Sequence, residues 1–477
     1  MTEKLLTNLK NNNFLTCSQG MIDKIFMSFI QTFGERLTKI SLTALLLILP
    51  SLINAQTANP QKTPLPSPFS LKREEAKAGN FLARYAELVR LENEYLASKQ
   101  QSNAYLQARA YAAAFIGDVR EANLMIDKAD GIRKGSAKPL ENSPLAALKA
   151  VDAEEFLLKA ADKNRVLMIN DGHHQPQTRV LTTRLLRGLY AKGFRYLAME
   201  TLNVSAGDAA QRKYPVFSDG YYTVESVFGD LARQALEIGY KLVPYESEGK
   251  ALEGETWIQR SNRREIEQAR NLKERIFDKD PNAKLLVFAG VSHISEKPQN
   301  VDEDQPWTFM AIRFKEMTGI DPFTADNQEM LSHSEPDAEP VVYRDAVRRG
   351  WVSNRAVIFA DDTGKAWTQG AEGMNVDAQI FLPPTKFVNG RPDWLARDLN
   401  RRALPIPPQL VSGADGLRLV QAFFENEPDD AVPADQILIR PEQPVPALML
   451  PRRGKGKFRL RVLDETGKIV GAMKIKL

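Results

Sequence analysis

Cysteine is almost absent from this chain, because only Cys17 among its 477 residues is a cysteine. A single cysteine cannot form a disulfide within the chain. Nor can it supply the several thiolates of a structural zinc site. Cys17 also lies upstream of the cleavage site predicted below, so we expect no cysteine nucleophile in the mature protein.

Histidine is scarce as well, and no sign of charge dominates. The chain has four histidines, and 64 lysines and arginines against 60 aspartates and glutamates give it a net charge of +4. Basic residues form no stripe interleaved with aromatic residues, so we expect no nucleic-acid partner. A Gly-x-Ser-x-Gly sequence is also missing, and the nucleophilic serine of that motif is therefore not indicated.

One apolar run, SLTALLLILPSLI (residues 41–53), lies near the N-terminus. Arg36 and Lys39 precede it, and Ala55 or Ala58 offers a small residue at which a signal peptidase could cut. The run is too short to span a bilayer comfortably. This combination predicts a secretory signal.

The signal determines what we expect of the mature protein. Residues 1–55 would be removed, and translation could start at Met21 or Met27, because the apolar run lies far from Met1. No later apolar run reaches the length of a membrane span. We therefore expect an exported protein, periplasmic or extracellular, with no membrane span after signal cleavage.

The mature chain is predicted to have four parts. Residues 56–70 are rich in Pro, Ser, Thr and Gln, which predicts a flexible leader. In residues 71–150 apolar side chains recur at helical spacing, and Asp118 with Glu121 forms a capping box before a helix over 119–129. This second part is expected to be a helical segment.

Residues 151–335, the third part, alternate short apolar strands with helices. The expected strands are RVLMIN (165–170), FRYLAME (194–200), KLVPYE (241–246) and KLLVFAG (284–290). Strands alternating with helices in this way are typical of a mainly parallel sheet flanked by helices. The predicted fold class is therefore α/β.

Residues 336–477, the fourth part, contain many prolines and short β-like runs such as AVIFA and QIFLPP. FRLRVLD alternates apolar and polar residues, ETGK forms a turn, and IVGAMKIKL returns, which predicts a β-hairpin. We expect a separate β-rich C-terminal domain and assign no chemistry to it.

Ionisable residues follow the predicted strands. Parallel α/β sheets bind ligands at the carboxyl ends of their strands. Three of the four histidines fall there, together with three carboxylates: Asp171, His173, His174, Glu200, Glu246 and His293. Each histidine alone could be a solvated turn residue or the partner of a buried carboxylate. Ionisable groups that converge on one crevice, however, are candidate acids and bases.

His173 and His174 lie in the turn before a helix that Pro176 would start. Side chains of adjacent residues in such a turn point in different directions. We therefore expect only one of these two histidines to reach the reacting atom.

Several motifs, in this order along the chain, resemble one superfamily. Asn170-Asp171-Gly172-His173-His174 follows a first strand, Leu197-Ala198-Met199-Glu200 ends a second, Arg264 and Asn271 share a helix, and Gly290-Val291-Ser292-His293 follows a late strand. Over about residues 150–325 the chain resembles the erythromycin esterases, ChaN-like haem-uptake proteins and Tiki or TraB proteins. The last motif matches the superfamily's Gly-x-x-His. The superfamily's other motif is a Gly-Glu-x-His or Gly-Glu-x-x-His turn, and this chain departs from it, with Asn170 in place of Gly and Asp171 in place of Glu.

The resemblance implies roles for these residues. In the esterase branch a histidine activates water, which would make His173 or His174 the general base, oriented by Asp171 or Glu200. His293 would then lie opposite, as an acid or as a donor to the developing oxyanion.

Further roles follow from the same resemblance. Arg264 or Arg179 would add positive charge to the oxyanion site. In the Tiki branch two histidines and a glutamate hold a divalent metal, a set that His173, Glu200 and His293 would provide here. In the ChaN-like branch haem is bound, with Tyr221 and Tyr222 as candidate contacts, although both tyrosines could equally be packing residues. The residues expected to contact substrate are Arg179, Tyr221, Tyr222, Glu246 and Asn271.

The sequence thus predicts an exported, hydrolase-like α/β protein. Its His/Glu site would activate water on an ester or amide in a small-molecule or peptide substrate. The alternative is a ChaN-like protein that binds haem or another small ligand without catalysis.

Overall fold

The computed structural model describes residues 65–131, 140–203, 207–301, 305–369, 374–413, 415–453 and 456–477. The predicted export signal and residues 56–64 of the predicted leader lie outside these ranges. Among the helices in these ranges, none combines the length and the apolar character needed to cross a membrane.

The N-terminal part is helical, as predicted. Its elements are η2 (Pro68–Ser70), α2 (Arg73–Lys77), α3 (Phe81–Arg90), α4 (Glu92–Leu96), α5 (Ser102–Phe115) and α6 (Val119–Ala129). Helix α6 begins where the capping pattern indicates, because the Asp118 carboxylate accepts a hydrogen bond of 3.1 Å from the Glu121 backbone N–H.

The end of the predicted leader is packed against these helices. The Tyr95 hydroxyl donates to the Pro66 carbonyl at 2.8 Å, and the Gln101 amide donates to the Leu65 carbonyl at 2.7 Å. The Phe69 ring lies 6.0 Å from the Tyr111 ring. The prediction of a flexible leader is therefore wrong for residues 65–70, because its composition does not reveal these partners on α4 and α5.

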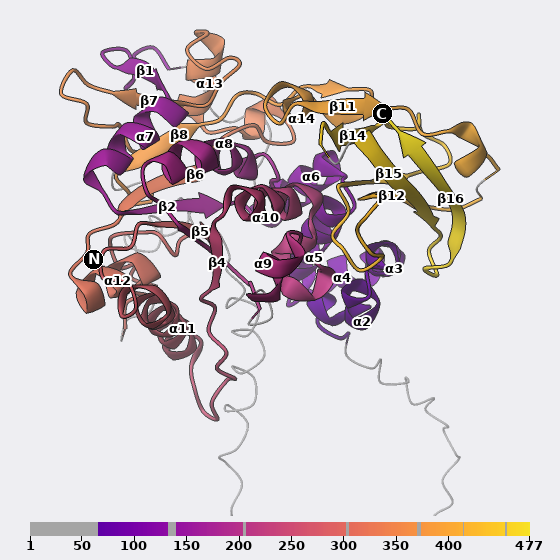
Figure 1. The fold of residues 1–477 in the computed structure, drawn as a ribbon, viewed down its shortest axis with the longest axis horizontal. Coiled ribbons are helices and arrows are strands. Elements are labelled where there is room, and N and C mark those ends of the chain that lie inside the picture. Colours follow the sequence, from indigo (N-terminus) through magenta and orange to yellow (C-terminus); the bar gives the residue numbers. More distant parts are fainter. Residues whose placement is uncertain are drawn as a thin grey trace, which may run out of the picture.

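The centre of the molecule is an eight-stranded sheet (Figure 1). Its strands are β1 (Lys149–Asp152), β2 (Val166–Asp171), β3 (Tyr196–Met199), β4 (Lys241–Pro244), β5 (Leu285–Gly290), β6 (Phe323–Met330), β7 (Val357–Ala360) and β8 (Ala378–Phe381). In space they follow the order β1-β7-β8-β6-β2-β5-β3-β4. The pairs from β8 to β4 are parallel, and only β1–β7 and β7–β8 are antiparallel. The mainly parallel α/β fold is thus confirmed.

Helices cover both faces of this sheet. They are α7 (Ala153–Lys163), α8 (Thr178–Ala191), α10 (Ser226–Ile238), α11 (Trp257–Leu272) with the π-helical turn Lys273–Phe277, α12 (Met310–Thr318) and α13 (Val341–Arg348). The chain between β3 and β4 also contains the short helix α9 (Ala209–Arg212). Along β2, Leu167 and Ile169 join the apolar core beneath α8 and α10, whereas Val166 and Met168 join the core beneath α11 and α12 (Figure 1). Burial of both faces explains why the strands are continuously apolar.

The sheet extends beyond the predicted boundary at residue 335. Strands β7 and β8 lie after that residue, and β8 pairs in parallel with β6, with Ala378 opposite Ala325. The boundary therefore falls between neighbouring strands of one sheet. Antiparallel β7 lies between β8 and β1 in the sheet. The order of the motifs along the chain does not indicate this arrangement.

The C-terminal part is β-rich, as predicted. A four-stranded antiparallel sheet has the order β13 (Asp435–Ile439), β12 (Arg418–Phe424), β15 (Lys457–Leu463) and β16 (Ile469–Lys476), and β15 and β16 form the predicted hairpin. Two pairs, β9 (Phe387–Val388) with β10 (Arg391–Pro392) and β11 (Arg401–Leu404) with β14 (Leu448–Pro451), flank α14 (Trp394–Arg397). The helical segment lies against the four-stranded sheet (Figure 1), where the Leu438 N–H donates to the Ile116 carbonyl at 2.9 Å.

Candidate functional site

The carboxyl ends of three neighbouring strands bring the predicted site residues together. Strands β2, β5 and β3 are adjacent in the sheet. His173 follows β2, Glu200 follows β3, and His293 follows β5. The Glu200 carboxylate lies between the two rings, 3.8 Å from Nε2 of His173 and 3.6 Å from Nε2 of His293.

A tight turn after β2 positions His173. The Gln175 N–H donates to the Gly172 carbonyl at 2.7 Å, which folds the chain back before α8 starts. The Asp171 carboxylate then lies 3.1 Å from Nδ1 of His173. An anionic carboxylate at this position holds the ring N–H on Nδ1 and leaves Nε2 as an acceptor. The Tyr222 ring stacks on the imidazole at 3.7 Å between centroids and fixes its plane.

His293 is held in the same way by a different carboxylate. Nδ1 of His293 lies 2.8 Å from the Glu265 carboxylate of α11. Glu265 also accepts hydrogen bonds from the Met310 N–H at 2.7 Å and from the Trp307 indole at 3.2 Å. Both imidazoles of the site are thus anchored at Nδ1 by buried carboxylates and present Nε2 to Glu200.

Gly290 is required by the close approach of Glu200. The Gly290 N–H donates to Oε2 of Glu200, and a β-carbon on Gly290 would overlap that oxygen and the His173 ring. No other residue type fits here without displacing the site. The next residue, Val291, has a φ of 40°, a left-handed conformation that is strained for a β-branched residue.

Arg264 of α11 joins Glu200 to Glu246. Its guanidinium donates to Glu200 at 2.8 Å and to the two oxygens of Glu246 at 2.8 and 2.6 Å. Nη1 of Arg264 also lies 3.1 Å from Nε2 of His293. Arg264 is therefore part of the site, and Glu246 orients it.

The pKa shifts follow from this charge arrangement. Burial alone raises the pKa of Asp171, but Arg179 and His173 outweigh it and hold that pKa at about 2. Burial likewise acts against ionisation of Glu200, yet His173, His293 and Arg264 hold its pKa well below the usual value. Burial lowers the pKa of His293, whereas Glu265 and Glu200 raise it further, to about 10.

A protonated His293 is also consistent with the charge balance. The carboxylates of Glu200, Glu246 and Glu265 surround Arg264 and His293. Arg264 alone would leave two of these three negative charges uncompensated, and a protonated His293 reduces this excess to one. The site therefore combines anionic Glu200 with two neighbouring cations.

Two residues expected to bind substrate instead form hydrogen bonds that position the residues of the site. Arg179 is completely buried and donates to Asp171, to Glu225 at 2.6 Å and to the His173 carbonyl at 3.0 Å. Asn271 donates to the carbonyls of Tyr245 and Glu246 at 3.1 Å and fixes the backbone after β4. Arg179 and Asn271 are therefore positioning residues.

His174 and Tyr221 lie away from this cluster. A small cavity of about 30 Å³ has His173, Glu200, Arg264 and His293 in its lining, and we call it the site cavity. Neither His174 nor Tyr221 lines the site cavity. Burial lowers the pKa of His174 to about 3, and the charges nearest to it include Asp127 and His333. The structure thus distinguishes the two adjacent histidines, as the turn geometry predicts.

The site has components that sequence reasoning missed. Glu265 lies on α11, where only Arg264 and Asn271 were selected. Helix α5 supplies Tyr111 and Gln107, and η2 supplies Phe69, to the lining of the site cavity. No local signal marks these three residues, because their approach to the strand ends depends on tertiary packing.

A divalent metal does not fit the arrangement. In the described ranges no group of three or more His, Cys, Asp or Glu side chains is placed to hold a metal ion. The positive charge beside Glu200 and His293 is instead the guanidinium of Arg264, 2.8 and 3.1 Å away. A cation bound there would be repelled by Arg264.

Haem does not fit the site cavity either. At about 30 Å³ the cavity has room for about one or two water molecules. Tyr222 is engaged with His173, and Tyr221 packs against Tyr222 and Phe115 at 5.0 and 5.5 Å between ring centroids. Tyr222 thus packs on His173 at the site cavity, and Tyr221 faces a second cavity described below.

Comparison with known proteins gives little similarity. No family model matches the chain, and a search of curated proteins finds no match. Among solved structures, one titled "The structure of the type III effector HopBA1" aligns with a TM-score of 0.26 and 16% sequence identity, covering 41% of this chain and 85% of the other.

Proposed function

We propose that this protein is an exported hydrolase that activates water on a carboxylic ester or amide. One observation supports it most strongly. Two imidazoles, each anchored at Nδ1 by a buried carboxylate, present Nε2 to the single carboxylate of Glu200 beside a cavity of water size. Perturbed acid and base groups that converge on a cavity are the general mark of such a site.

His173 is the general base of this proposal. In the neutral form of the ring the free lone pair is on Nε2, because Nδ1 donates to Asp171. A water held between Nε2 and Glu200 would transfer a proton to Nε2 as its oxygen bonds to the substrate carbonyl carbon. His173 would then return the proton to the leaving oxygen or nitrogen as the bond to carbon breaks. Asp171 and the stacked Tyr222 keep the ring in place throughout.

His293 and Arg264 stabilise the negative charge that develops on the substrate oxygen. Both are cationic groups that line the site cavity, and each is already anchored by carboxylates, so neither needs to reorganise during the reaction. These roles agree with the esterase branch of the superfamily that the motifs resemble. The predicted signal over residues 1–55 places the reaction outside the cytoplasm in this proposal.

Hydrolysis of a defined panel tests the proposal. The purified secreted chain is assayed on para-nitrophenyl esters of increasing acyl length and on aminoacyl para-nitroanilides, with and without EDTA. We expect turnover of at least one class at a rate that EDTA does not change, because Arg264 already provides the positive charge beside Glu200. Failure to turn over any ester or amide would contradict the proposal, as would loss of activity in EDTA with recovery on adding Zn²⁺.

A further inference from the structure

A second, much larger cavity adjoins the candidate site. Its volume is about 580 Å³, and Glu246, which holds Arg264, and Thr201, which follows Glu200, are among its lining residues. We call it the wide cavity. Its walls come from the helical segment, from the chain after β3 and from the chain after β4. A ligand in the wide cavity thus lies next to the groups that anchor the reacting centre.

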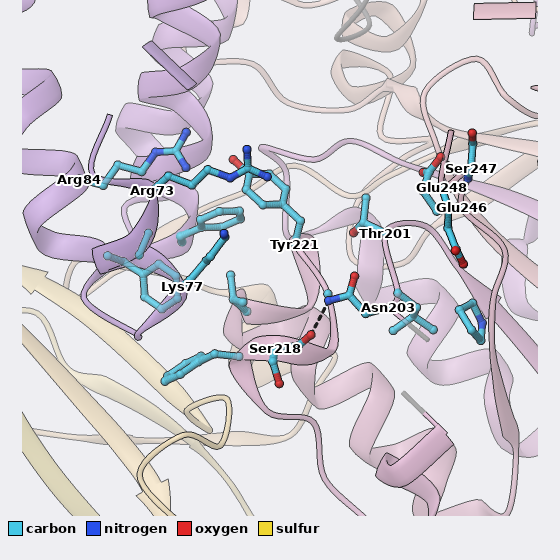
Figure 2. Close-up of a pocket in the computed structure, with 18 of the residues that line it drawn as sticks. Arg73, Lys77, Arg84, Thr201, Asn203, Ser218, Tyr221, Glu246, Ser247 and Glu248 are labelled. Atoms are coloured by element: carbon cyan, nitrogen blue, oxygen red, sulfur yellow. Dashed lines mark hydrogen bonds between the residues drawn. The ribbon is translucent and has the colours of Figure 1, made fainter. Parts of the chain in front are cut away.

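The two sides of the wide cavity differ in charge. Figure 2 shows Arg73, Lys77 and Arg84 of the helical segment on one side, and Glu246 and Glu248 on the other. Arg275 also lines the cavity and pairs with Glu248 at 3.4 Å. Aromatic rings complete the basic side, where Phe81 packs edge-on against Phe115 and Phe217 at 6.0 and 5.5 Å between centroids.

Arg84 is a buried cation with no ion-pair partner among the residues that the structure describes. Its side chain lines the wide cavity although the residue is only 2% exposed. Nη2 donates to the Phe69 carbonyl at 3.2 Å, but Nε has no hydrogen-bond partner within the described residues. A carbonyl oxygen carries no net charge, so this contact does not neutralise the guanidinium.

The other buried arginines differ from Arg84. In the described part of the chain, five further arginines are buried, and each has a carboxylate within 4.0 Å. They are Arg109, Arg179, Arg233, Arg391 and Arg401. No carboxylate of the described residues forms an ion pair with Arg84. Burying a charge without a partner costs free energy. An unpaired guanidinium at the wall of a cavity would gain its partner when a ligand brings an anionic group into the cavity.

We infer that Arg84 binds a carboxylate of the substrate, so that the enzyme acts on anionic esters or amides. The inference rests on the proposed function for the reaction itself. A guanidinium pairs with a planar carboxylate through parallel N–H donors, and Arg73 and Lys77 add positive charge at the same wall.

The remaining lining favours a carboxylate over a phosphate. A carboxylate carries one negative charge, whereas a phosphate monoester carries nearly two. Glu246 and Glu248 on the opposite side are already paired with Arg264 and Arg275, and the rings of Phe81, Phe115 and Phe217 cannot solvate a second negative charge. A singly charged group attached to an apolar chain matches this lining best.

Two esters of equal length test the inference on the enzyme. The para-nitrophenyl monoester of adipic acid carries a free carboxylate, and para-nitrophenyl hexanoate does not. We expect the parent to prefer the adipate ester. Arg84→Gln should lower kcat/KM for the adipate ester by about 10- to 100-fold, through KM, and leave the hexanoate ester nearly unchanged. The matched control is Arg90→Gln, an exposed arginine of the same helix that is bonded to Glu87 and is not among the residues lining the cavity.

Binding to the parent gives a measurement that does not depend on folding of the variant or on turnover. Phenylacetate should raise the melting temperature of the parent more than phenylacetamide or phenylphosphonate does. Equal shifts for phenylacetate and phenylacetamide would overturn the inference, and a larger shift for phenylphosphonate would overturn the choice of a carboxylate. If the parent hydrolyses both esters without preference, this inference fails and the proposed function stands. If phenylacetate stabilises the parent but no ester or amide is hydrolysed, the proposed function fails alone.

Discussion

Glu200→Gln is expected to lower kcat for hydrolysis by about 10²- to 10⁴-fold, because it removes the carboxylate on which both imidazoles converge. In the parent, Oε1 accepts from Arg264 and Oε2 accepts from the Gly290 N–H. Glutamine must place its NH₂ group at one of these positions, opposite another donor. The glutamine also lacks the negative charge that holds His293 and Arg264 in place and helps to position the water.

The effect is measured as steady-state hydrolysis of the best substrate of the panel, together with the melting temperature. The control is Glu316→Gln, which changes an exposed glutamate of α12 that pairs with Arg313 at 3.1 Å. We expect the control to match the parent. A folded Glu200→Gln variant with parental kcat would show that Glu200 takes no part in the reaction.

Arg179→Met is expected to lower the free energy of unfolding by about 3–5 kcal/mol. Arg179 is fully buried and pairs with Asp171 and Glu225, at 3.1 and 2.6 Å. Methionine replaces the stem of the side chain but leaves both carboxylates buried without a cation. The loss of activity would follow indirectly, because Asp171 would no longer be held against His173.

The matched control lies one turn further along the same helix. Arg184 of α8 is partly exposed and pairs with Glu154 at 2.8 Å. Arg184→Met should cost no more than about 1 kcal/mol, since exposed ion pairs contribute little. Both variants are compared by urea unfolding. An equal, small decrease in the free energy of unfolding for the two variants would show that the ion pairs of Arg179 with Asp171 and Glu225 do not stabilise the fold.

The central residues of the site could be predicted from the sequence because each directly follows a strand that can be recognised locally. Continuous apolar runs identify strands buried on both faces, and the residues directly after them lie at one edge of a parallel sheet. His173, Glu200 and His293 converge for this reason. The distinction between His173 and His174 also follows from the turn, although the sequence does not say which of the two faces the site.

The parts that were missed depend on partners far away in the chain. Strand β6 contains Thr324, Asp326 and Asn327, so it lacks an apolar pattern, yet it is buried. Two of its polar groups pair with Asn170 of β2. The side-chain amide of Asn170 donates to Asp326 at 2.7 Å, and its side-chain oxygen accepts from the Asn327 backbone N–H at 2.6 Å. A sequence pattern cannot show such a pairing in advance. Nor can a sequence pattern show the partners of Glu265, or that Arg73, Lys77 and Arg84 line one side of the wide cavity, because tertiary packing brings these residues to their sites.

A single turnover in ¹⁸O-labelled water tests the central claim most directly, namely that water activated by His173 attacks the substrate. Enzyme in excess over a para-nitrophenyl ester is allowed to react once, and the released acid and the peptide containing Glu200 are analysed by mass spectrometry. We expect one ¹⁸O atom in each released acid and none in Glu200, because water adds directly to the carbonyl carbon. Incorporation of ¹⁸O into the Glu200 carboxylate would contradict it, since that label requires an acyl intermediate on Glu200.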